Sequence, residues 1–578
     1  MKNIANIIFL AAILLLAPSC GEKFLDVQPQ GVISDEALNT PANIEGLVIA
    51  AYAMLGNDHY SVPNQLWPWG DLRAGDSYKG GDGPADIANY HAMEVFSTLQ
   101  PDMKAYAPAV LGDLNNKKWT RLYTSVSRAN NALRRLNDIP ESEFPLKNTR
   151  IAEMRFLRGQ YYFDLKILYK QMPWVSENDS PLEIEQLGNT DLTNAQLWEN
   201  IIAEFRFAAE NLPATQSDKG RPTKFTAKAC LAKALLYAAY EQDDDHQVVN
   251  INEQKLQEVV AVVDEVVASG KYALEPDFAN PFLWEHENGP ESVWAIQRSH
   301  DDGTSTGMID FSAMLNAPMS TEFGCCWFHI PSQNLVNSFK TTTNGLPDFE
   351  NFNNSDLNSS VNTIDPRLDH TVAQPGKPWK YETSLIYTEA EWARQPGIYG
   401  PFSSLKENVS PNCDCFEQLP PFMGSSKNTI LIRYADVLLW KAEALIELGR
   451  HKEALSIVND IRLRAKNSTA RLKFADGSPI SNYKVEPYLE AYWTQDFARK
   501  ALRYERRLEF AMEGHRFFDL IRWGIAAQTL EVYFSIEKTK RDYLNNAQFQ
   551  TGKHEYLPIP QQQINLSGGK YVQNPRYN

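Results

Sequence analysis

A short segment after residue 66 combines aromatic rings with charged side chains, as ligand-binding loops often do. It contains Trp67, Trp69, Asp71, Arg73, Asp76 and Tyr78, with five glycines between positions 70 and 83. The rings could stack on the apolar faces of a sugar, while the charged groups hydrogen-bond to its hydroxyls. The glycines favour an irregular loop that presents these groups. Because tryptophan is usually largely buried, the alternative is that Trp67 and Trp69 fix the loop to its scaffold.

A second aromatic cluster lies at residues 323–329, in the order Phe-Gly-Cys-Cys-Trp-Phe-His. Adjacent large rings cannot all point inward, so Phe323 and Trp327 are candidate ligand contacts, and Trp327 is the strongest single candidate. Three weaker candidates stand in polar surroundings that contain Pro and Gly: Trp379, Trp392 and Tyr399. For these three the alternative is ordinary packing at the surface. Trp284 and Trp294 are predicted to be core residues.

Cysteines at positions 230, 325, 326, 413 and 415 follow the N-terminal segment, and an odd number cannot all pair. Cys230 lies in an apolar helical pattern, which predicts a buried free thiol. Two close pairs are possible loop disulfides in an exported protein: Cys325 with Cys326, and Cys413 with Cys415. A disulfide beside Trp327 would stiffen its loop and reduce the entropy lost on binding.

Metal-binding patterns are weak. A transition-metal site needs His or further Cys at ligand spacing, and His329 is the only close candidate, so no metal centre is predicted. Calcium is an optional ligand, because Asp301-Asp302-Gly303 and Asp82-Gly83 offer carboxylate oxygens without the spacing of a complete calcium loop. No other cofactor is predicted.

Residues 1–19 have the pattern of a signal peptide. Lys2 precedes an eleven-residue apolar run from Ile7 to Ala17, far short of the roughly 20 residues that span a bilayer. Small residues then lead into Cys20, as in a bacterial lipobox, where that cysteine is acylated and becomes the mature N-terminus. The alternative is an ordinary signal peptide followed by an incidental cysteine. We expect a soluble body that is held at a membrane by its lipid.

The composition is that of a globular protein, with 578 residues, 43% hydrophobic and 22% charged. Acidic residues outnumber basic ones by 72 to 56, which gives a formal charge of −16. A chain this acidic, without a concentrated basic patch, is not expected to bind nucleic acid.

Apolar residues three and four apart predict long helices in the first half and the last third of the chain. The predicted helices span 119–136, 152–169, 195–212, 224–240, 256–267, 434–448 and 451–465. Residues 434–465 have tetratricopeptide-like spacing, with a turn at Gly449-Arg450. Charged residues within 497–523 are predicted to form intramolecular ion pairs. Between about 270 and 430 the periodicity fades, which indicates long functional loops.

The chain resembles the SusD/RagB family of outer-membrane nutrient-binding lipoproteins, from Cys20 to its last residues. Motifs that carry this resemblance are Arg128-Ala129-Asn130, Arg155-Phe156-Leu157-Arg158-Gly159, Pro222-Thr223-Lys224, Glu291-Ser292-Val293-Trp294, Asp365-Pro366-Arg367 and Arg433-Tyr434-Ala435-Asp436. The most specific motifs are C-terminal: Glu505-Arg506-Arg507-Leu508-Glu509-Phe510, Glu513-Gly514-His515-Arg516-Phe517-Phe518-Asp519-Leu520 and Leu557-Pro558-Ile559-Pro560.

The resemblance implies a mainly α, SusD-like fold: tetratricopeptide-like helix pairs in a right-handed scaffold, with long irregular loops and few short strands. It implies one domain over 20–578, with helices at about 117–268 and 431–523 and a variable ligand-loop region at about 270–430. It also implies a lipid-anchored protein on the extracellular face of the outer membrane. Such a protein captures an oligosaccharide or other nutrient and closes over a SusC-like TonB-dependent β-barrel transporter.

Two other functions remain open on the sequence alone. A surface glycoside hydrolase would share the acidic, aromatic-rich composition, but its carboxylate pair cannot be recognised from spacing. A tetratricopeptide scaffold would bind protein or peptide in a concave groove. The sequence has no nucleophile elbow, zinc-protease helix or phosphate loop. The full-length resemblance to the SusD/RagB family implies a binding protein and not an enzyme.

Overall fold

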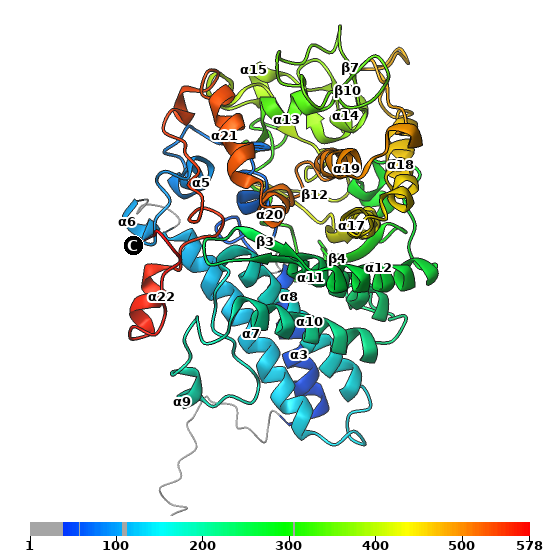
Figure 1. Cartoon of the computed structure of the whole chain (residues 1–578). Coiled ribbons are helices and arrows are strands. Elements are labelled where there is room, and N and C mark those ends of the chain that lie inside the picture. The colour runs from blue at the N-terminus through cyan, green and yellow to red at the C-terminus, as the bar shows by residue number, and fades with distance from the viewer. Residues whose placement is uncertain (1–38, 57, 107–111, 305–306, 578) are drawn as a thin grey trace, which may run out of the picture.

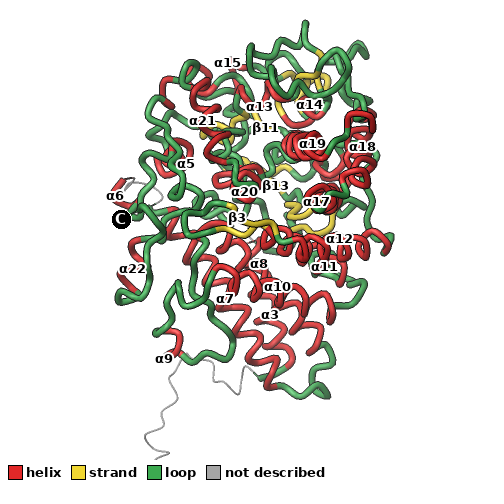
Figure 2. The backbone as a smooth tube through the Cα atoms, viewed as in Figure 1, coloured by secondary structure: helices red, strands yellow, loops and turns green. Residues whose placement is uncertain are grey.

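The computed structural model describes residues 39–56, 58–106, 112–304 and 307–577. Long helices form one half of the molecule, and short helices, two-stranded sheets and loops form much of the other half (Figures 1 and 2). The predicted signal peptide and Cys20 lie outside the described residues. No helix in the described ranges combines the length and the apolar character that a membrane span requires.

The long-helix half is built from consecutive helices that pack against one another. These are α3 (Pro41–Gly56), α7 (Leu114–Asp138), α8 (Lys147–Tyr169), α10 (Asn194–Asn211), α11 (Lys224–Ala239) and α12 (Glu253–Ala268). Side chains cap several of them: Thr193 forms a capping box with Gln196, and Asn252 accepts the backbone N–H of Lys255. Each predicted helix is present, and the predicted pairs α8 with α10 and α11 with α12 pack together.

A second helical group follows the loop region in sequence. It comprises α17 (Tyr434–Glu447), α18 (His451–Asn467), α19 (Gln495–Glu509), α20 (Arg516–Arg522) and α21 (Ala526–Glu537). The antiparallel pair α17 and α18 confirms the tetratricopeptide-like hairpin, and α17 also packs against α11 and α12. The remaining, shorter helices are α4 (Trp67–Gly70), α5 (Ala88–Val95), α6 (Met103–Tyr106), α9 (Pro181–Ile184), α13 (Gln333–Ser338), α14 (Arg367–Thr371), α15 (Glu389–Trp392), α16 (Pro396–Tyr399) and α22 (Gln561–Leu566).

Strands are short and pair only in antiparallel twos among the described residues. The pairs are β1 (Ser77–Gly80) with β5 (Phe328–Pro331), β2 (Tyr240–Gln242) with β3 (Val248–Ile251), β4 (Ser292–Ile296) with β14 (Thr429–Arg433), β6 (Lys340–Thr341) with β7 (Thr363–Ile364), β8 (Val372–Ala373) with β11 (Ser403–Ser404), β9 (Pro378–Trp379) with β10 (Glu382–Ile386), and β12 (Phe416–Leu419) with β13 (Phe422–Ser425). With so little backbone pairing, side-chain packing must hold most of the loop region in place.

The charged residues of α19 join the second helical group to the loop region. The buried Glu509 carboxylate bonds to Arg367 of α14 (3.1 Å) and Arg433 of β14 (2.9 Å), and it also pairs with Arg464 of α18. Burial alone would raise the pKa of Glu509, but these guanidinium groups lower it well below its usual value. The predicted ion pairs in residues 497–523 are therefore confirmed, and they link helices to loops.

Candidate ligand-binding site

All of the aromatic and charged side chains that the sequence proposed as ligand contacts are buried. Their exposed fractions are 4% or less for Trp67, Trp69, Asp71, Arg73, Asp76, Tyr78, Phe323, Trp327, Trp379, Trp392 and Tyr399. The expectation that they form an exposed stacking surface is wrong, and the alternative of core packing for Trp67 and Trp69 is right. Trp284 differs in the opposite sense, because it is 36% exposed although it was expected in the core; Trp294 is buried as expected.

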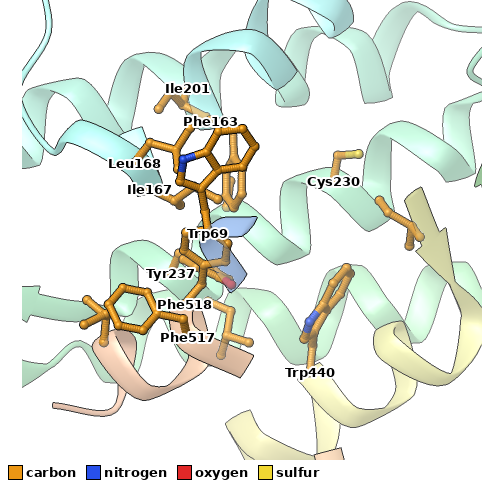
Figure 3. Close-up of a cluster of buried hydrophobic side chains, with 14 of the residues drawn as sticks. Trp69, Phe163, Ile167, Leu168, Ile201, Cys230, Tyr237, Trp440, Phe517 and Phe518 are labelled. Atoms are coloured by element: carbon orange, nitrogen blue, oxygen red, sulfur yellow. The ribbon is translucent and has the colours of Figure 1, made fainter. Parts of the chain in front are cut away.

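The two predicted segments do meet, but they form a buried seam. Strand β1 pairs with β5, which places residues 77–80 beside 328–331. Trp67 stacks on His329 with ring centroids 4.9 Å apart. Trp69 belongs to the same buried cluster as Phe163 and Leu168 of α8 (Figure 3), and the ammonium of Lys118 of α7 lies 4.7 Å from its ring centroid. The rings thus anchor the glycine-rich loop to the long helices.

His329 is the electrostatic centre of this seam. Its Nε2 lies 3.1 Å from Asp71 and its Nδ1 lies 2.7 Å from Glu407. Burial would lower the pKa of His329, but Glu407 and Asp71 outweigh it and raise the pKa to about 9. Burial raises the pKa of Asp71 to about 6, against the hydrogen bond from His329. The imidazolium therefore compensates carboxylates inside the fold, which is a structural role.

The aromatic residues of the loop region build small cores of their own. Phe323 contacts Trp379 and Trp392 with ring centroids 5.1 and 5.0 Å apart, and Trp379 also stacks on Tyr387. Trp327 packs in a neighbouring cluster, where its indole N–H donates to Ser403 at 2.9 Å. A polar sequence context therefore did not indicate exposure, because these rings cover one another.

Two half-exposed rings that the sequence did not single out form the best candidate for ligand stacking. Tyr60 follows α3, Phe422 begins β13, and their ring centroids are 5.5 Å apart. The exposed His59 ring lies 3.9 Å from the Tyr60 ring. We name these three side chains the aromatic shelf. A pair of partly accessible rings beside a polar ring is suited to the apolar face and hydroxyl groups of a sugar.

The hairpin that carries Phe422 is held in place from both ends. Cys413 and Cys415 form a disulfide just before β12, and Cys325, which is bonded to Cys326, pairs with Phe422 in an isolated parallel bridge. Both possible disulfides are present, and Cys230 is a buried free thiol as predicted. The two disulfides lie beside the Phe422 hairpin of the aromatic shelf. The expected role of a disulfide in stiffening an exposed Trp327 loop does not apply, because Trp327 is buried.

Close packing at Gly324 fixes this bridge. Gly324 has φ of +93°, and a Cβ there would lie 2.5 Å from the carbonyl oxygen of Pro421. Glycine is therefore required for the hairpin turn to approach the 323–326 segment. On the opposite side, Gln65 donates to Asp310 at 2.6 Å, and the backbone N–H of Asp310 donates to Ser425 of β13. These contacts tie the Tyr60 segment to the Phe422 hairpin.

Half-exposed polar groups lie close to the hairpin. His300 is 2.6 Å from the Ser426 hydroxyl, and Ser320 accepts the backbone N–H of Gly324. These positions supply donors and acceptors next to the rings. Sequence signals for the shelf did exist, since Phe422 follows Pro420-Pro421 and turn residues usually lie at the surface.

Within the described residues, no group of three His, Cys, Asp or Glu side chains is placed to hold a metal ion. The carboxylate of Asp302 is engaged by Ser299 (2.7 Å) and Thr304 (2.6 Å), and that of Asp82 accepts from Gln395. Calcium binding stays a prediction.

Comparisons with known proteins agree with the fold. The SusD family model matches residues 290–577, and the family described as starch-binding associating with outer membrane matches residues 23–236. SusD-like protein P2 of Formosa agariphila is 25% identical over 581 residues, 98% of this chain and 98% of that protein. A SusD homolog from Bacteroides thetaiotaomicron superposes with a TM-score of 0.69 at 20% identity, covering 93% of this chain and 97% of its own.

A further solved structure is the surface glycan-binding protein A of Bacteroides thetaiotaomicron in complex with laminarihexaose. It has a TM-score of 0.65 and 21% identity and covers 93% of this chain and 99% of its own. These structures share the mainly helical architecture with few short strands. The two family matches together span most of the sequence, and the C-terminal match contains the Glu505–Leu520 motifs. The chain belongs to the SusD/RagB family.

Proposed function

We propose that this protein binds an oligosaccharide at the aromatic shelf of His59, Tyr60 and Phe422. The observation that carries the proposal is the half-exposed Tyr60–Phe422 ring pair, in which the Phe422 hairpin follows one disulfide and pairs with the segment that contains the other. A site that is rigid before binding loses less entropy when a flexible glycan stacks on it. The laminarihexaose complex of a protein with the same fold supports a glycan as the ligand class.

We further propose that acylated Cys20 tethers the protein to the extracellular face of the outer membrane. There it would act as the lid of a SusC-like TonB-dependent transporter, which supplies the energy for uptake. The leader pattern of residues 1–20 and the outer-membrane association named for the matching family support this location. Its role is capture and not bond cleavage.

Calorimetric titration of the purified protein against laminarin, its oligosaccharides and a panel of other soluble polysaccharides tests the binding role. We expect saturable heat with an intact ligand. Tyr60→Ala and Phe422→Ala should each weaken binding by about tenfold to a hundredfold, since burying one aromatic ring contributes about 1.5–3 kcal/mol. Tyr492→Ala is the matched control, because Tyr492 is 69% exposed and lies on the separate 3-10 turn Glu490–Tyr492.

Three results would contradict this proposal. Shortened products after incubation with clean protein would indicate a hydrolase. Equal losses in Tyr492→Ala and Tyr60→Ala would place the ligand elsewhere. Retention of full affinity in a Tyr60→Ala, Phe422→Ala double variant would show that the shelf is not the site.

A further inference from the structure

Two arginine side chains from neighbouring helices lie together in the C-terminal part of the fold. Arg503 is in α19, and Arg516 is the first residue of α20. Their guanidinium carbons lie 5.1 and 5.9 Å, respectively, from the ring centroid of Trp523. The Nη1 of Arg516 donates to the backbone carbonyl of Arg503 at 3.4 Å. The two cations therefore share one location, between α19 and the end of α20.

Neither guanidinium group is neutralised within the described ranges of the chain. There the Arg503 side chain forms no hydrogen bond or ion pair, and the bond to the Arg503 carbonyl is the only hydrogen bond of the Arg516 guanidinium. Both residues are half-buried, yet none of their unbonded guanidinium nitrogens is buried. Since a guanidinium group has five N–H donors, most donors of this pair are accessible and unused.

The nearby carboxylates are already bonded to other arginines. Four carboxylates act electrostatically on the pair: Glu443 and Glu447 on Arg503, and Asp76 and Asp519 on Arg516. Their ion pairs are Glu443 with Arg522, Glu447 with Arg499, Asp519 with Arg506 and Arg522, and Asp76 with Arg507. The second oxygen of Asp76 has no hydrogen bond, but it forms no ion pair with Arg516 in the described structure. The pair is therefore left without a bonded internal counter-ion.

The electrostatic cost of holding this pair in the fold is not fully offset. Burial lowers the pKa of Arg503, and it lowers the pKa of Arg516 to about 10. Repulsion from Arg507 and Arg503 adds to the lowering at Arg516. Both side chains still carry their charge at neutral pH. An anion bonded to the two guanidinium groups would offset both the burial and the repulsion, so it would stabilise the folded state.

We propose that Arg503 and Arg516 form a binding site for one oxyanion group, a sulfate, phosphate or carboxylate. Planar guanidinium groups match the oxygens of such groups with paired, charge-assisted hydrogen bonds. The overall charge of −16 does not prevent binding, because charges more than about 8 Å away are largely screened at physiological ionic strength. The oxyanion is either a free inorganic ion or a substituent of a carbohydrate. The site is independent of the proposed oligosaccharide site, because it contains no residue of the aromatic shelf.

Calorimetric titration of the purified protein at constant ionic strength tests the site with sodium sulfate, sodium phosphate, glucuronate and glucose 6-sulfate. Glucose is the neutral counterpart. We expect saturable binding of at least one anion, with a higher unfolding temperature in its presence. Arg503→Gln and Arg516→Gln should each weaken binding about tenfold, because each removes charge-assisted hydrogen bonds. Arg206→Gln is the matched control, since it removes the same charge from a surface ion pair with Glu258.

The panel also distinguishes the two sources of the oxyanion. Equal affinity for inorganic sulfate and glucose 6-sulfate would support a free ion, whereas tighter binding of an anionic sugar than of either inorganic ion would support a carbohydrate substituent. Tyr60→Ala should retain anion binding while it loses oligosaccharide affinity, so failure of one site leaves the other testable.

Three results would overturn the proposal. These are no saturable response to any of the four anions, equal affinity losses in Arg206→Gln and Arg503→Gln, and equal responses to glucose and glucose 6-sulfate. If Arg516→Gln does not fold, Arg503→Gln decides alone, because the Arg503 side chain has no hydrogen bond or ion pair to lose within the described residues. Arg503→Lys, which keeps the charge but not the paired donors, should cause a smaller loss than Arg503→Gln.

Discussion

The long helices of residues 114–268 and the loop region of about 270–430 reach a packed state by different means. In the helices, backbone hydrogen bonds are internal, and apolar stripes at regular spacing meet in pairs. In the loop region, strands of two to five residues provide little backbone pairing. There, buried rings such as Trp379 and Trp327 and buried ion pairs provide the cohesion.

This contrast teaches that polar neighbours in the sequence do not make an aromatic side chain a ligand contact. In irregular structure, a few large side chains must bury enough apolar surface to fix many residues of loop. The two partly accessible rings of the shelf, Tyr60 and Phe422, lie in a turn and directly after a turn, at the start of β13. The position of these two rings at or beside a turn, and not the local composition of the sequence, left them at the surface.

The largest expected effect comes from cutting the ionic link between the C-terminal helices α18 and α19 and the loop region. Glu509→Ala leaves three buried guanidinium groups, those of Arg367, Arg433 and Arg464, without their shared carboxylate. Breaking such a buried network should lower the free energy of unfolding by about 5 kcal/mol. Chemical denaturation of the variant and the wild type measures the change.

Glu453→Ala is the matched control, since Glu453 forms an exposed pair with Arg450 on α18. It should cause no measurable change. A small effect of Glu509→Ala, comparable with that of Glu453→Ala, would show that the loop region is held to the helices without these ions.

The next prediction tests whether the buried aromatic side chains of the loop region stabilise the fold as helix-core side chains do. Trp379→Ala should destabilise the protein by about 4 kcal/mol, as much as Trp440→Ala in helix α17, because both side chains are 1% exposed or less. Thermal and denaturant unfolding of both variants measures this. If Trp379→Ala left stability intact and removed glycan binding instead, the original expectation of an exposed ligand contact would be restored.

A smaller effect concerns His329, in the buried seam between the segment of residues 67–80 and the loop region. Because the folded state raises the pKa of His329 from 6.5 to about 9, the folded protein holds a proton that the unfolded chain releases between these pH values. The resulting stability, up to about 3 kcal/mol, should be fully present below pH 6.5 and lost as the pH rises through 9. Unfolding measured across this range tests the sign.

His329→Gln should flatten the pH dependence in that window, since the titrating group is gone. Asp71, with a pKa of about 6, adds its own change only at lower pH, where its protonation favours the folded state. Stability that rose between pH 7 and pH 9 in the wild type would contradict the assignment of a charged His329 between Asp71 and Glu407.

Much of the fold could be predicted because helices are local. Apolar spacing in residues 224–240 and 434–465 requires only neighbours three and four positions away, and the observed α11, α17 and α18 begin and end within two residues of the predicted bounds. Proximity in sequence identified the two cysteine pairs as possible disulfides, and the structure contains both bonds. The candidate site was not, because exposure of Trp67 or Trp327 depends on contacts with residues hundreds of positions away.

By itself the sequence determined the helices, the family motifs and the acidic charge, since each depends on residue type and short spacing. The tertiary structure decided which rings are accessible. It turned Trp67, Trp327 and Trp379 inward, left Tyr60 and Phe422 at the surface, and brought Arg503 and Arg516 together at Trp523. Burial is a property of how distant segments pack, and irregular loops carry no periodicity from which that packing can be read.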